Sequence, residues 1–337
     1  MKPVCITGAT GFVGSHIVDA FLAAGIPVRA AVRSPDDYDK TEPLRLMAGH
    51  HGTELSFYAA DLSLEGTFDE AMEGCGGLIH VAAVARLAAP EPQRQIVDPS
   101  IEGARNVLSS ASKAGIKKVV LTSSIAAVGD YRAAQKRPLT ESDWNDAATI
   151  ATNPYGFAKT QAERLAWEVS KEAPWDLVVI NPGMVMGPVF STRHCRASPI
   201  TVRDIMKVAT PGNARVCLPI VDARDVAAAH LAAYQRDDAQ GRHILVHGNR
   251  WLKEMAMTLD KAFPERGIRT GELPNLMVKF ASLFTKALDG KVLADILDRE
   301  PHYDGSHATQ ALGITYRDIE QSILDTARSM VTQGFIA

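Results

Sequence analysis

The stretch VCITGATGFVGSHIV, residues 4–18, decides the fold of this chain. It begins with apolar and β-branched residues that predict a short strand, and it ends in apolar residues at helical spacing. Between them lie Gly8, Gly11 and Gly14. Glycines here allow a tight turn and let backbone N–H groups approach a pyrophosphate, towards which the following helix points its positive end. Because a strand and a helix flank the glycines, we interpret them as a dinucleotide-binding loop rather than a merely structural turn.

Beyond this unit, short apolar runs alternate with longer amphipathic runs. We expect strands at residues 3–7, 27–33, 54–60, 77–83, 117–123 and 176–181, and helices near residues 12–24, 64–73, 98–115 and 155–172. Such alternation predicts an α/β fold of Rossmann type, with a doubly wound parallel sheet covered by helices on both faces. Runs such as KVVLT and LVVIN are apolar almost throughout, which suits strands buried on both sides.

The pattern changes after about residue 182, where prolines and glycines become frequent. Helices are then expected at 222–236, 251–263, 274–288 and 317–333, with one strand at 242–248. We therefore expect residues 1–182 to form the dinucleotide-binding domain, with a later part, about 216–248, returning to it. Residues 183–337 are expected to form most of a smaller, mainly helical substrate-binding lobe.

The composition is that of an ordinary globular protein. The 337 residues are 46% hydrophobic and 22% charged, with a net charge of −3, so the chain has no basic surface suited to nucleic acid or to a membrane. The apolar run at 78–90 is too short to span a bilayer and contains Arg86. A strand beginning almost at Met1 leaves no room for a signal peptide, so we expect a soluble, cytoplasmic protein.

The cysteines favour a reduced protein without a metal. They are scattered and form no C-x-x-C pair, which is typical neither of a zinc site nor of a disulfide framework. The four residues are Cys5, Cys75, Cys195 and Cys217. We expect no metal ligands in this chain.

Tyr155 and Lys159 lie four residues apart in NPYGFAKTQAERLAW, residues 153–167. Residues at this spacing share one face of a helix. Pro154 is tolerated in a first helical turn, so the pair is expected at the positive end of its helix. The lysine cation and the helix end both favour phenolate over phenol, which suits a tyrosine that donates a proton. The alternative is a surface aromatic beside a solvated cation.

These motifs resemble the extended short-chain dehydrogenase/reductase superfamily over nearly the whole chain. The shared features are the T-G-x-x-G-x-x-G loop, Asp61-Leu62 after the third strand, HVAA at 80–83, NPGMVMGP at 181–188 and VDARDVAAAHLAA at 221–233. The resemblance implies that Asp61-Leu62 contacts adenine and that 181–188 closes over nicotinamide. Taken singly, Asp61 could be a helix N-cap, a role compatible with adenine contact, and the prolines could simply end a strand. His80 taken singly is better explained as a strand-end histidine than as a catalyst.

The resemblance also implies a catalytic set of Ser124, Tyr155 and Lys159. Ser124 aligns with the strand-end serine that binds the substrate carbonyl, while Ser123 is a second candidate. Asn106 matches an asparagine with a structural or a proton-relay role in the family, and both roles stay open. The family often has a serine directly before the lysine, where this chain has Ala158.

The second strand indicates which cofactor is used. NAD enzymes place a carboxylate at its end to bind the ribose 2′-hydroxyl, but this chain has Val32 followed by Arg33. A guanidinium can bind a 2′-phosphate through two hydrogen bonds. Arg33 and Lys40 resemble the pair used for NADPH by the dihydroflavonol reductase and cinnamoyl-CoA reductase branch. Asp36 and Asp37 follow nearby, either as turn residues or, if one reached the ribose, as ligands for NAD.

The resemblance thus implies NADPH/NADP+ as cofactor. The cofactor-binding residues that it implies are Thr7, Gly8, Gly11, Phe12, Val13, Gly14, Arg33, Lys40, Asp61, Leu62, Val81, Ala82, Ala83, Tyr155, Lys159, Pro182, Gly183 and Val185.

We therefore expect an NADPH-dependent reductase of small-molecule aldehydes or ketones. A nucleotide-sugar epimerase or dehydratase, and a hydroxysteroid dehydrogenase, share the catalytic set, while a dinucleotide sensor would not need it. The substrate pocket is expected between 126–152 and 184–218. Its candidate lining residues are Trp144, Met184, Met186, Val189 and Phe190, with His194 and Arg196 as polar candidates. The helices at 98–115 and 155–172 resemble the pair through which family members form homodimers.

Overall fold

A computed structural model describes residues 1–130, 137–284 and 296–336 of the chain. Its centre is a seven-stranded sheet with the order β3-β2-β1-β4-β5-β6-β9, in which all neighbours run parallel. The strands are β1 (Val4–Thr7), β2 (Val28–Val32), β3 (Leu55–Ala59), β4 (Gly77–His80), β5 (Lys118–Thr122), β6 (Asp176–Pro182) and β9 (Gly241–Leu245). The strand order reverses direction between β1 and β4, so the carboxyl ends of these strands form the crevice in which such folds bind ligands.

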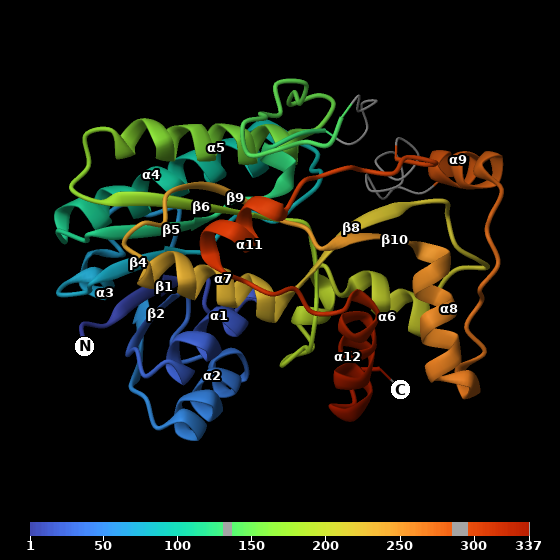
Figure 1. The fold of residues 1–337 in the computed structure, drawn as a ribbon, viewed down its shortest axis with the longest axis horizontal. Coiled ribbons are helices and arrows are strands. Elements are labelled where there is room, and N and C mark those ends of the chain that lie inside the picture. Colours follow the sequence, from blue (N-terminus) through green and yellow to red (C-terminus); the bar gives the residue numbers. More distant parts are fainter. Residues whose placement is uncertain (131–136, 285–295, 337) are drawn as a thin grey trace.

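Helices cover both faces of this sheet, which confirms the doubly wound prediction (Figure 1). One face carries α1 (Phe12–Ala23), α2 (Tyr38–His51) and α7 (Ala223–Gln235). The other carries α3 (Asp69–Met72), α4 (Asp98–Lys113) and α5 (Pro154–Ser170). The two layers enclose separate groups of buried side chains, because each face of the sheet packs against its own helices.

A second, smaller sheet lies beyond the carboxyl edge of the first. It has the order β10-β8-β7, formed by β7 (Met184–Met186), β8 (Cys217–Asp222) and β10 (Gly248–Trp251). The helices around it are α6 (Ile200–Met206), α8 (Leu252–Ala262), α9 (Asn275–Phe284), α11 (Ser306–Leu312) and α12 (Ile319–Thr332). The sequence predicts a mainly helical lobe for residues 183–337 and does not predict the strands β7, β8 and β10. Within the returning stretch at 216–248, α7 and β9 join the main sheet whereas β8 belongs to the smaller one.

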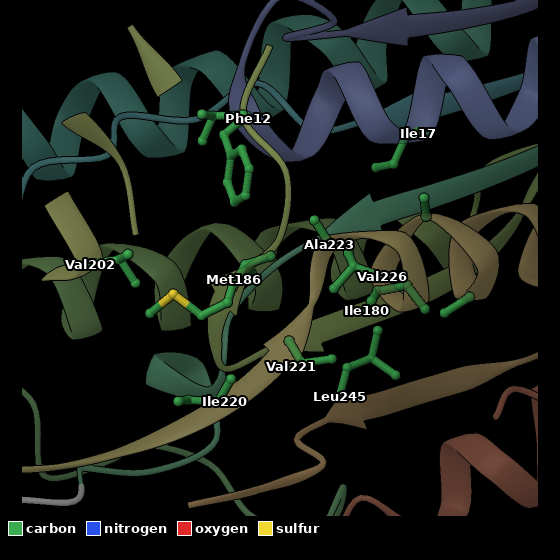
Figure 2. Packing of buried hydrophobic residues seen from close by; sticks show 14 of the residues in the cluster. Phe12, Ile17, Ile180, Met186, Val202, Ile220, Val221, Ala223, Val226 and Leu245 are labelled. Carbon is green, nitrogen blue, oxygen red and sulfur yellow. The ribbon is translucent and has the colours of Figure 1, made fainter. Parts of the chain in front are cut away.

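One hydrophobic core joins the two sheets (Figure 2). Ile180 of β6 and Leu245 of β9 pack beside Val221 of β8, so the last strands of the main sheet and the smaller sheet share a single interior. Met186 of β7 is fully buried in the same cluster. The smaller lobe is therefore held against the main sheet by apolar contact.

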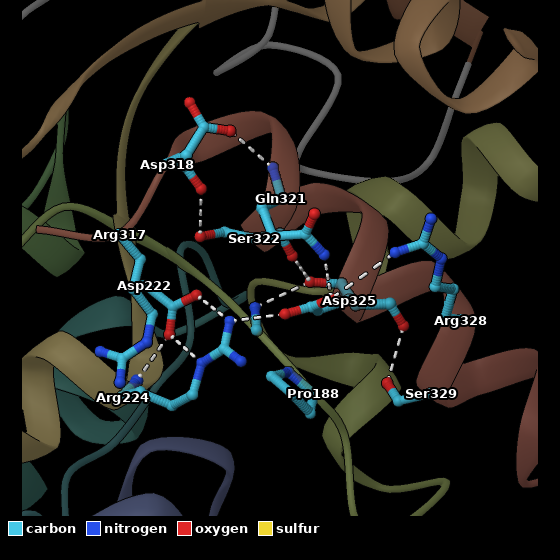
Figure 3. A network of polar contacts seen from close by, with 12 residues as sticks. Pro188, Asp222, Arg224, Arg317, Asp318, Gln321, Ser322, Asp325, Arg328 and Ser329 are labelled. Atoms are coloured by element: carbon cyan, nitrogen blue, oxygen red, sulfur yellow. Dashed lines mark hydrogen bonds and ion pairs between the residues drawn. The ribbon is translucent and has the colours of Figure 1, made fainter. Parts of the chain in front are cut away.

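A polar network fastens the C-terminal helix α12 to this frame (Figure 3). Arg224, in the first turn of α7, makes a two-pronged contact with Asp222, with an Nη2–Oδ2 distance of 2.7 Å, and its Nη2 also lies 2.8 Å from Oδ2 of Asp325 on α12. Arg317, just before α12, pairs with the buried Asp225. The last helix is thus anchored at two acids of the β8–α7 junction.

Two helix predictions differ from the structure. The helix expected at 64–73 is reduced to the single turn of α3, preceded by turns. The helix α2 was not predicted, because Pro43 lies inside it and its apolar residues are few. The helix expected at 274–288 is α9, and residues 285–288 lie outside the described residues. No helix within the described ranges is both long and apolar enough to cross a bilayer.

Candidate cofactor and catalytic site

The glycine loop leaves no room for side chains at two of its positions. Gly8 has a φ of +67°, and a Cβ there would lie 2.7 Å from the backbone nitrogen of Ala82. A Cβ on Gly14 would lie 2.1 Å from the carbonyl oxygen of Gly8. Gly11 stands at the N-cap of α1, where it offers no side chain to the free N–H groups. The start of α1 therefore presents backbone donors and a helix dipole to an anion such as a pyrophosphate.

The Thr7 side chain connects this loop to the end of β4 by hydrogen bonds. Its Oγ1 accepts hydrogen bonds from the backbone N–H groups of Val81 and Ala82, both at 3.1 Å, and lies 2.8 Å from Nδ1 of His80. Burial, with a smaller contribution from the charge of Lys159, lowers the pKa of His80 to about 3. His80 is therefore a neutral, buried histidine whose Nδ1 accepts a hydrogen bond from the Thr7 hydroxyl. This agrees with its interpretation as a strand-end histidine.

The segment after β7 closes against the start of α1. Nε2 of His194 lies 3.2 Å from the carbonyl oxygen of Thr10, and Nε2 of His16 lies 2.8 Å from that of Pro188. The ring of Phe190 lies 4.6 Å from that of His16. We had predicted Phe190 and His194 as pocket residues, but their rings are used to join the 188–194 segment to the glycine loop.

The catalytic candidates come from two adjoining elements at the carboxyl edge. Ser124 follows β5 and begins a short 3-10 turn at Ile125–Ala127, with its Oγ 3.1 Å from the backbone nitrogen of Ala126. Tyr155 and Lys159, both half-buried, lie in the first turns of α5, which packs against that turn. Asn153 caps the helix by accepting the N–H of Gly156 at 3.0 Å.

A cavity reaches from this helix to the end of β4. It is lined by Lys159, by His80 and Ala82 of the β4 end, and by Ser123. Within the described part of the chain, neither Tyr155 nor Ser124 is among its lining residues. Ser123 is buried and its hydroxyl has no partner among the described residues, so both serines remain candidates for the carbonyl contact.

The adenine-side candidates form a separate group. The Asp61 carboxylate accepts hydrogen bonds from Oγ and the backbone N–H of Ser63, at 2.7 and 2.8 Å. These bonds, with the charge of Arg33, lower the pKa of Asp61 against a smaller opposing effect of burial. Asp61 therefore shapes a turn rather than capping a helix. Nδ2 of Asn106 donates to the carbonyl oxygen of Leu62 at 2.9 Å, which favours the structural role for Asn106.

Two cations stand beside the end of β2. Arg33 is exposed and makes no hydrogen bond or ion pair with any other residue in the described ranges. Lys40, in α2, forms an ion pair with Asp37. The hydrogen bond from Lys40, opposed by desolvation, lowers the pKa of Asp37, and the charges of Lys40 and Arg193 act in the same direction as that bond. The guanidinium of Arg33 is thus available to an anionic ligand, whereas Lys40 already has a partner.

Four of the predicted residues have side chains in the interior. The side chains of Phe12, Val185, Met186 and Val189 belong to the hydrophobic core, so the expectation that Met186 and Val189 line the pocket was wrong. Of the remaining predicted cofactor residues, Val13 lies in α1, Ala83 follows β4, Pro182 ends β6 and Gly183 lies just beyond it.

The Trp144 ring contacts two guanidinium groups. Its ring lies 4.0 Å from the guanidinium carbon of Arg242 and 5.0 Å from that of Arg164. Among the pocket candidates, Met184 remains half-buried and Arg196 exposed. Residues 131–136 of the expected pocket insert lie outside the described residues.

Comparison with known proteins relates this site to reductases. The sequence pattern described as "NAD dependent epimerase/dehydratase family" matches residues 4–246. A cinnamoyl-CoA reductase from Medicago truncatula is 33% identical, covering 98% of this chain and 96% of its own length. A dihydroflavonol 4-reductase from Callistephus chinensis is 35% identical, covering 79% of this chain and 74% of its own.

Solved structures with the same fold include two that hold a cofactor. Gre2 from Candida albicans in complex with NADPH has a TM-score of 0.81 at 27% identity, covering 98% of this chain and 99% of its own. The yeast methylglyoxal/isovaleraldehyde reductase Gre2 complexed with NADPH has a TM-score of 0.80 at 25% identity, covering 99% and 100%.

Proposed function

Since the chain belongs to the NAD-dependent epimerase/dehydratase family, we propose that it is an NADPH-dependent carbonyl reductase that reversibly converts an aldehyde or ketone into an alcohol. The observation that carries this proposal is the placement of Tyr155 and Lys159 in the first turns of α5, against the Ser124 turn. Reductases among the relatives and structural neighbours support it.

The residues present fit NADPH. Gly8 and Gly14 form a cradle that any Cβ would fill, and the start of α1 suits the pyrophosphate. Arg33 offers a guanidinium to the 2′-phosphate, and Lys40 can join it by leaving Asp37. The position at the end of β2 where NAD enzymes carry an acid holds Val32, which favours this reading over an NAD-dependent epimerase.

The proposed mechanism uses three residues of this chain, Ser124, Tyr155 and Lys159. NADPH, when bound, supplies the hydride. Tyr155 donates its phenolic proton to the carbonyl oxygen as negative charge develops there. The Ser124 hydroxyl donates a hydrogen bond to the same oxygen, which stabilises the developing charge. Lys159 binds the ribose and stabilises the phenolate that Tyr155 becomes.

Replacing the proton donor tests this function. We expect Tyr155→Phe to lower kcat roughly 10²- to 10⁴-fold, because general acid catalysis contributes about that much. Loss of NADPH absorbance would be followed against a panel of aldehydes and ketones that includes a steroid ketone. Nucleotide sugars would be assayed for epimerised or dehydrated products. Tyr58→Phe, in β3, is the matched control and should keep full activity. If Tyr155→Phe kept near-full activity, Tyr155 would not be the general acid.

We also infer that residues 1–182, with α7 and β9, bind the cofactor and that the smaller lobe binds the substrate. The protein is expected to act in the cytoplasm as a homodimer joined through α4 and α5. These helices lie side by side on one face of the sheet, which supports a shared interface (Figure 1). Light scattering of the full chain measures the oligomeric state.

A further inference from the structure

Three buried polar side chains form a hydrogen-bonded group next to the Ser124 turn and have no role in the mechanism above. They are Glu163 of α5, Asn181 of β6 and Arg242 of β9. We propose that they form a positioning cluster that fixes the Ser124 turn relative to the helix carrying Tyr155 and Lys159. The proposal rests on the proposed function, because it assigns a catalytic purpose to the Ser124 position.

Glu163 continues the face of α5 that carries the catalytic pair. It follows Lys159 by four residues and Tyr155 by eight, so all three lie along one side of the helix. Its carboxylate is fully buried and accepts three hydrogen bonds, one of them from Nε1 of Trp167 on the same helix at 3.4 Å. Nε of Arg242 lies 2.6 Å from Oε1, and Nδ2 of Asn181 lies 2.9 Å from Oε2. The carboxylate thus ties the catalytic helix to two strands of the main sheet.

The same two donors hold both ends of the serine turn. Nδ2 of Asn181 also donates to the carbonyl oxygen of Ser124 at 3.2 Å. Nη2 of Arg242 reaches the carbonyl oxygen of Ala127, the last residue of the turn, at 3.4 Å. An amide and a guanidinium therefore connect one carboxylate on α5 to the beginning and the end of the segment that Ser124 starts.

Arg242 extends the cluster into the segment after the turn. Its Nη1 donates to the carbonyl oxygen of Glu141 at 2.8 Å and to that of Asp143, while its guanidinium carbon lies 4.0 Å from the Trp144 ring. The planar guanidinium has several donors in fixed directions, and a lysine ammonium has no such fork. The rigid guanidinium of Arg242 therefore fixes the position of the 141–144 segment relative to the serine turn.

The chemistry of the cluster favours positioning over stability. A buried ion pair loses much of its attraction to desolvation, and apolar residues of similar volume often stabilise a fold as well or better. Nδ2 of Asn181 donates to two oxygen atoms, so the amide cannot be turned over to place Oδ1 against them. In this orientation Oδ1 has no hydrogen-bond partner among the described residues. The orientation of the amide thus satisfies its donor group and leaves Oδ1 without a hydrogen bond.

The test removes the Asn181 amide and measures kcat with and without the Ser124 hydroxyl. We expect Asn181→Ala to lower kcat roughly 10- to 100-fold, since small misplacements of reacting groups cost about that much, while the Kd for NADPH changes less than about twofold. In the Ser124→Ala background the same substitution should change kcat less than about twofold, because the cluster acts through Ser124. A merely structural role would lower kcat in both backgrounds alike.

The matched control is Asn249→Ala in β10, whose Nδ2 donates to the carbonyl oxygen of Pro301 at 2.7 Å and to Oε1 of Glu300 at 3.4 Å. It should keep kcat although it also loses two amide hydrogen bonds. Should Asn181→Ala fail to fold, Arg242→Lys keeps the charge facing Glu163 but loses the fork, and should show the same fall in kcat. Unchanged kcat in a folded variant of either kind would overturn the proposal.

Hydrogen exchange separates this proposal from the proposed function. The amides of Ala127 and Val128 are bonded to the carbonyl oxygens of Ser124 and Ile125, at 3.0 and 2.9 Å. We expect Asn181→Ala to raise their exchange rates about tenfold or more and Asn249→Ala to leave them unchanged. If the parent protein reduced no carbonyl, the proposed function would fail and this measurement alone would decide the positioning role. Unchanged exchange of these amides in Asn181→Ala would overturn it.

Discussion

At the scale of single residues, cofactor choice depends on what each cation already binds. Arg33 is exposed and, in the described ranges, unpaired, whereas Lys40 is paired with Asp37. A 2′-phosphate would gain the full charge-assisted contact with Arg33, but it would have to displace Asp37 to reach Lys40. Arg33 should therefore contribute more to the preference for NADPH than Lys40 does.

We expect Arg33→Ala to raise the KM for NADPH roughly 10- to 100-fold, which corresponds to the loss of one or two charged hydrogen bonds. The KM for NADH should change less than about twofold, because that cofactor has no phosphate there. Lys40→Ala should have a smaller effect. Arg29→Ala on the same strand, which removes a guanidinium bonded to the carbonyl of Glu73, is the control. Equal effects on both cofactors would contradict this assignment.

At the scale of elements, the C-terminal helix supports the segment that closes against the glycine loop. Oγ1 of Thr326 accepts the N–H of Gly187 at 2.7 Å, and Oγ of Ser329 accepts that of Val189 at 2.9 Å. Gln333 donates to the carbonyl oxygen of Val189 at 2.7 Å. Helix α12 thus satisfies backbone groups that have left β7 and cannot pair within a strand.

Thr326→Val tests this support, because it keeps the shape of the side chain and removes the acceptor for the buried N–H of Gly187. We expect the free energy of unfolding to fall by about 1–3 kcal/mol, as for other unsatisfied buried donors. Urea unfolding measures this change. Thr332→Val, at an exposed position of the same helix, should alter stability by less than about 0.5 kcal/mol. Equal stability of the two variants would argue against the support.

At the scale of the whole molecule, the fold buries five neutral histidines in different layers. Burial is the largest cause in each case, and it lowers the pKa of His80 to about 3 and of the others to about 4. The five are His16, His80, His194, His230 and His243. In the unfolded chain they titrate near pH 6.5, so below that pH the unfolded state binds more protons than the folded state.

Stability should therefore be level above about pH 7 and fall as the pH drops from about 6.5 to 4. Each histidine contributes on the order of 1–3 kcal/mol to this loss. Urea unfolding at several pH values measures the slope. His230 bonds Thr122 through Nε2 at 2.7 Å, and His230→Gln should reduce the slope. A pH-independent stability between 7 and 4.5 would refute this account.

The sequence by itself determined the parallel sheet, the glycine loop and the placement of Tyr155 and Lys159 one turn apart on a helix. These features are local, because strand burial, glycine backbone freedom and helical spacing are written within a few neighbouring residues. It did not reveal α2, where Pro43 and few apolar residues obscure the helix, or the strands β7, β8 and β10.

Only the tertiary structure decided which apolar residues are core and which polar residues meet. Met186 and Val189 were indistinguishable from pocket residues until their burial was seen. Glu163, Asn181 and Arg242 come from three elements, and the outer two lie 79 positions apart in the chain. No local pattern marks such a cluster, because its members meet only when β6 and β9 pair and α5 packs on their sheet.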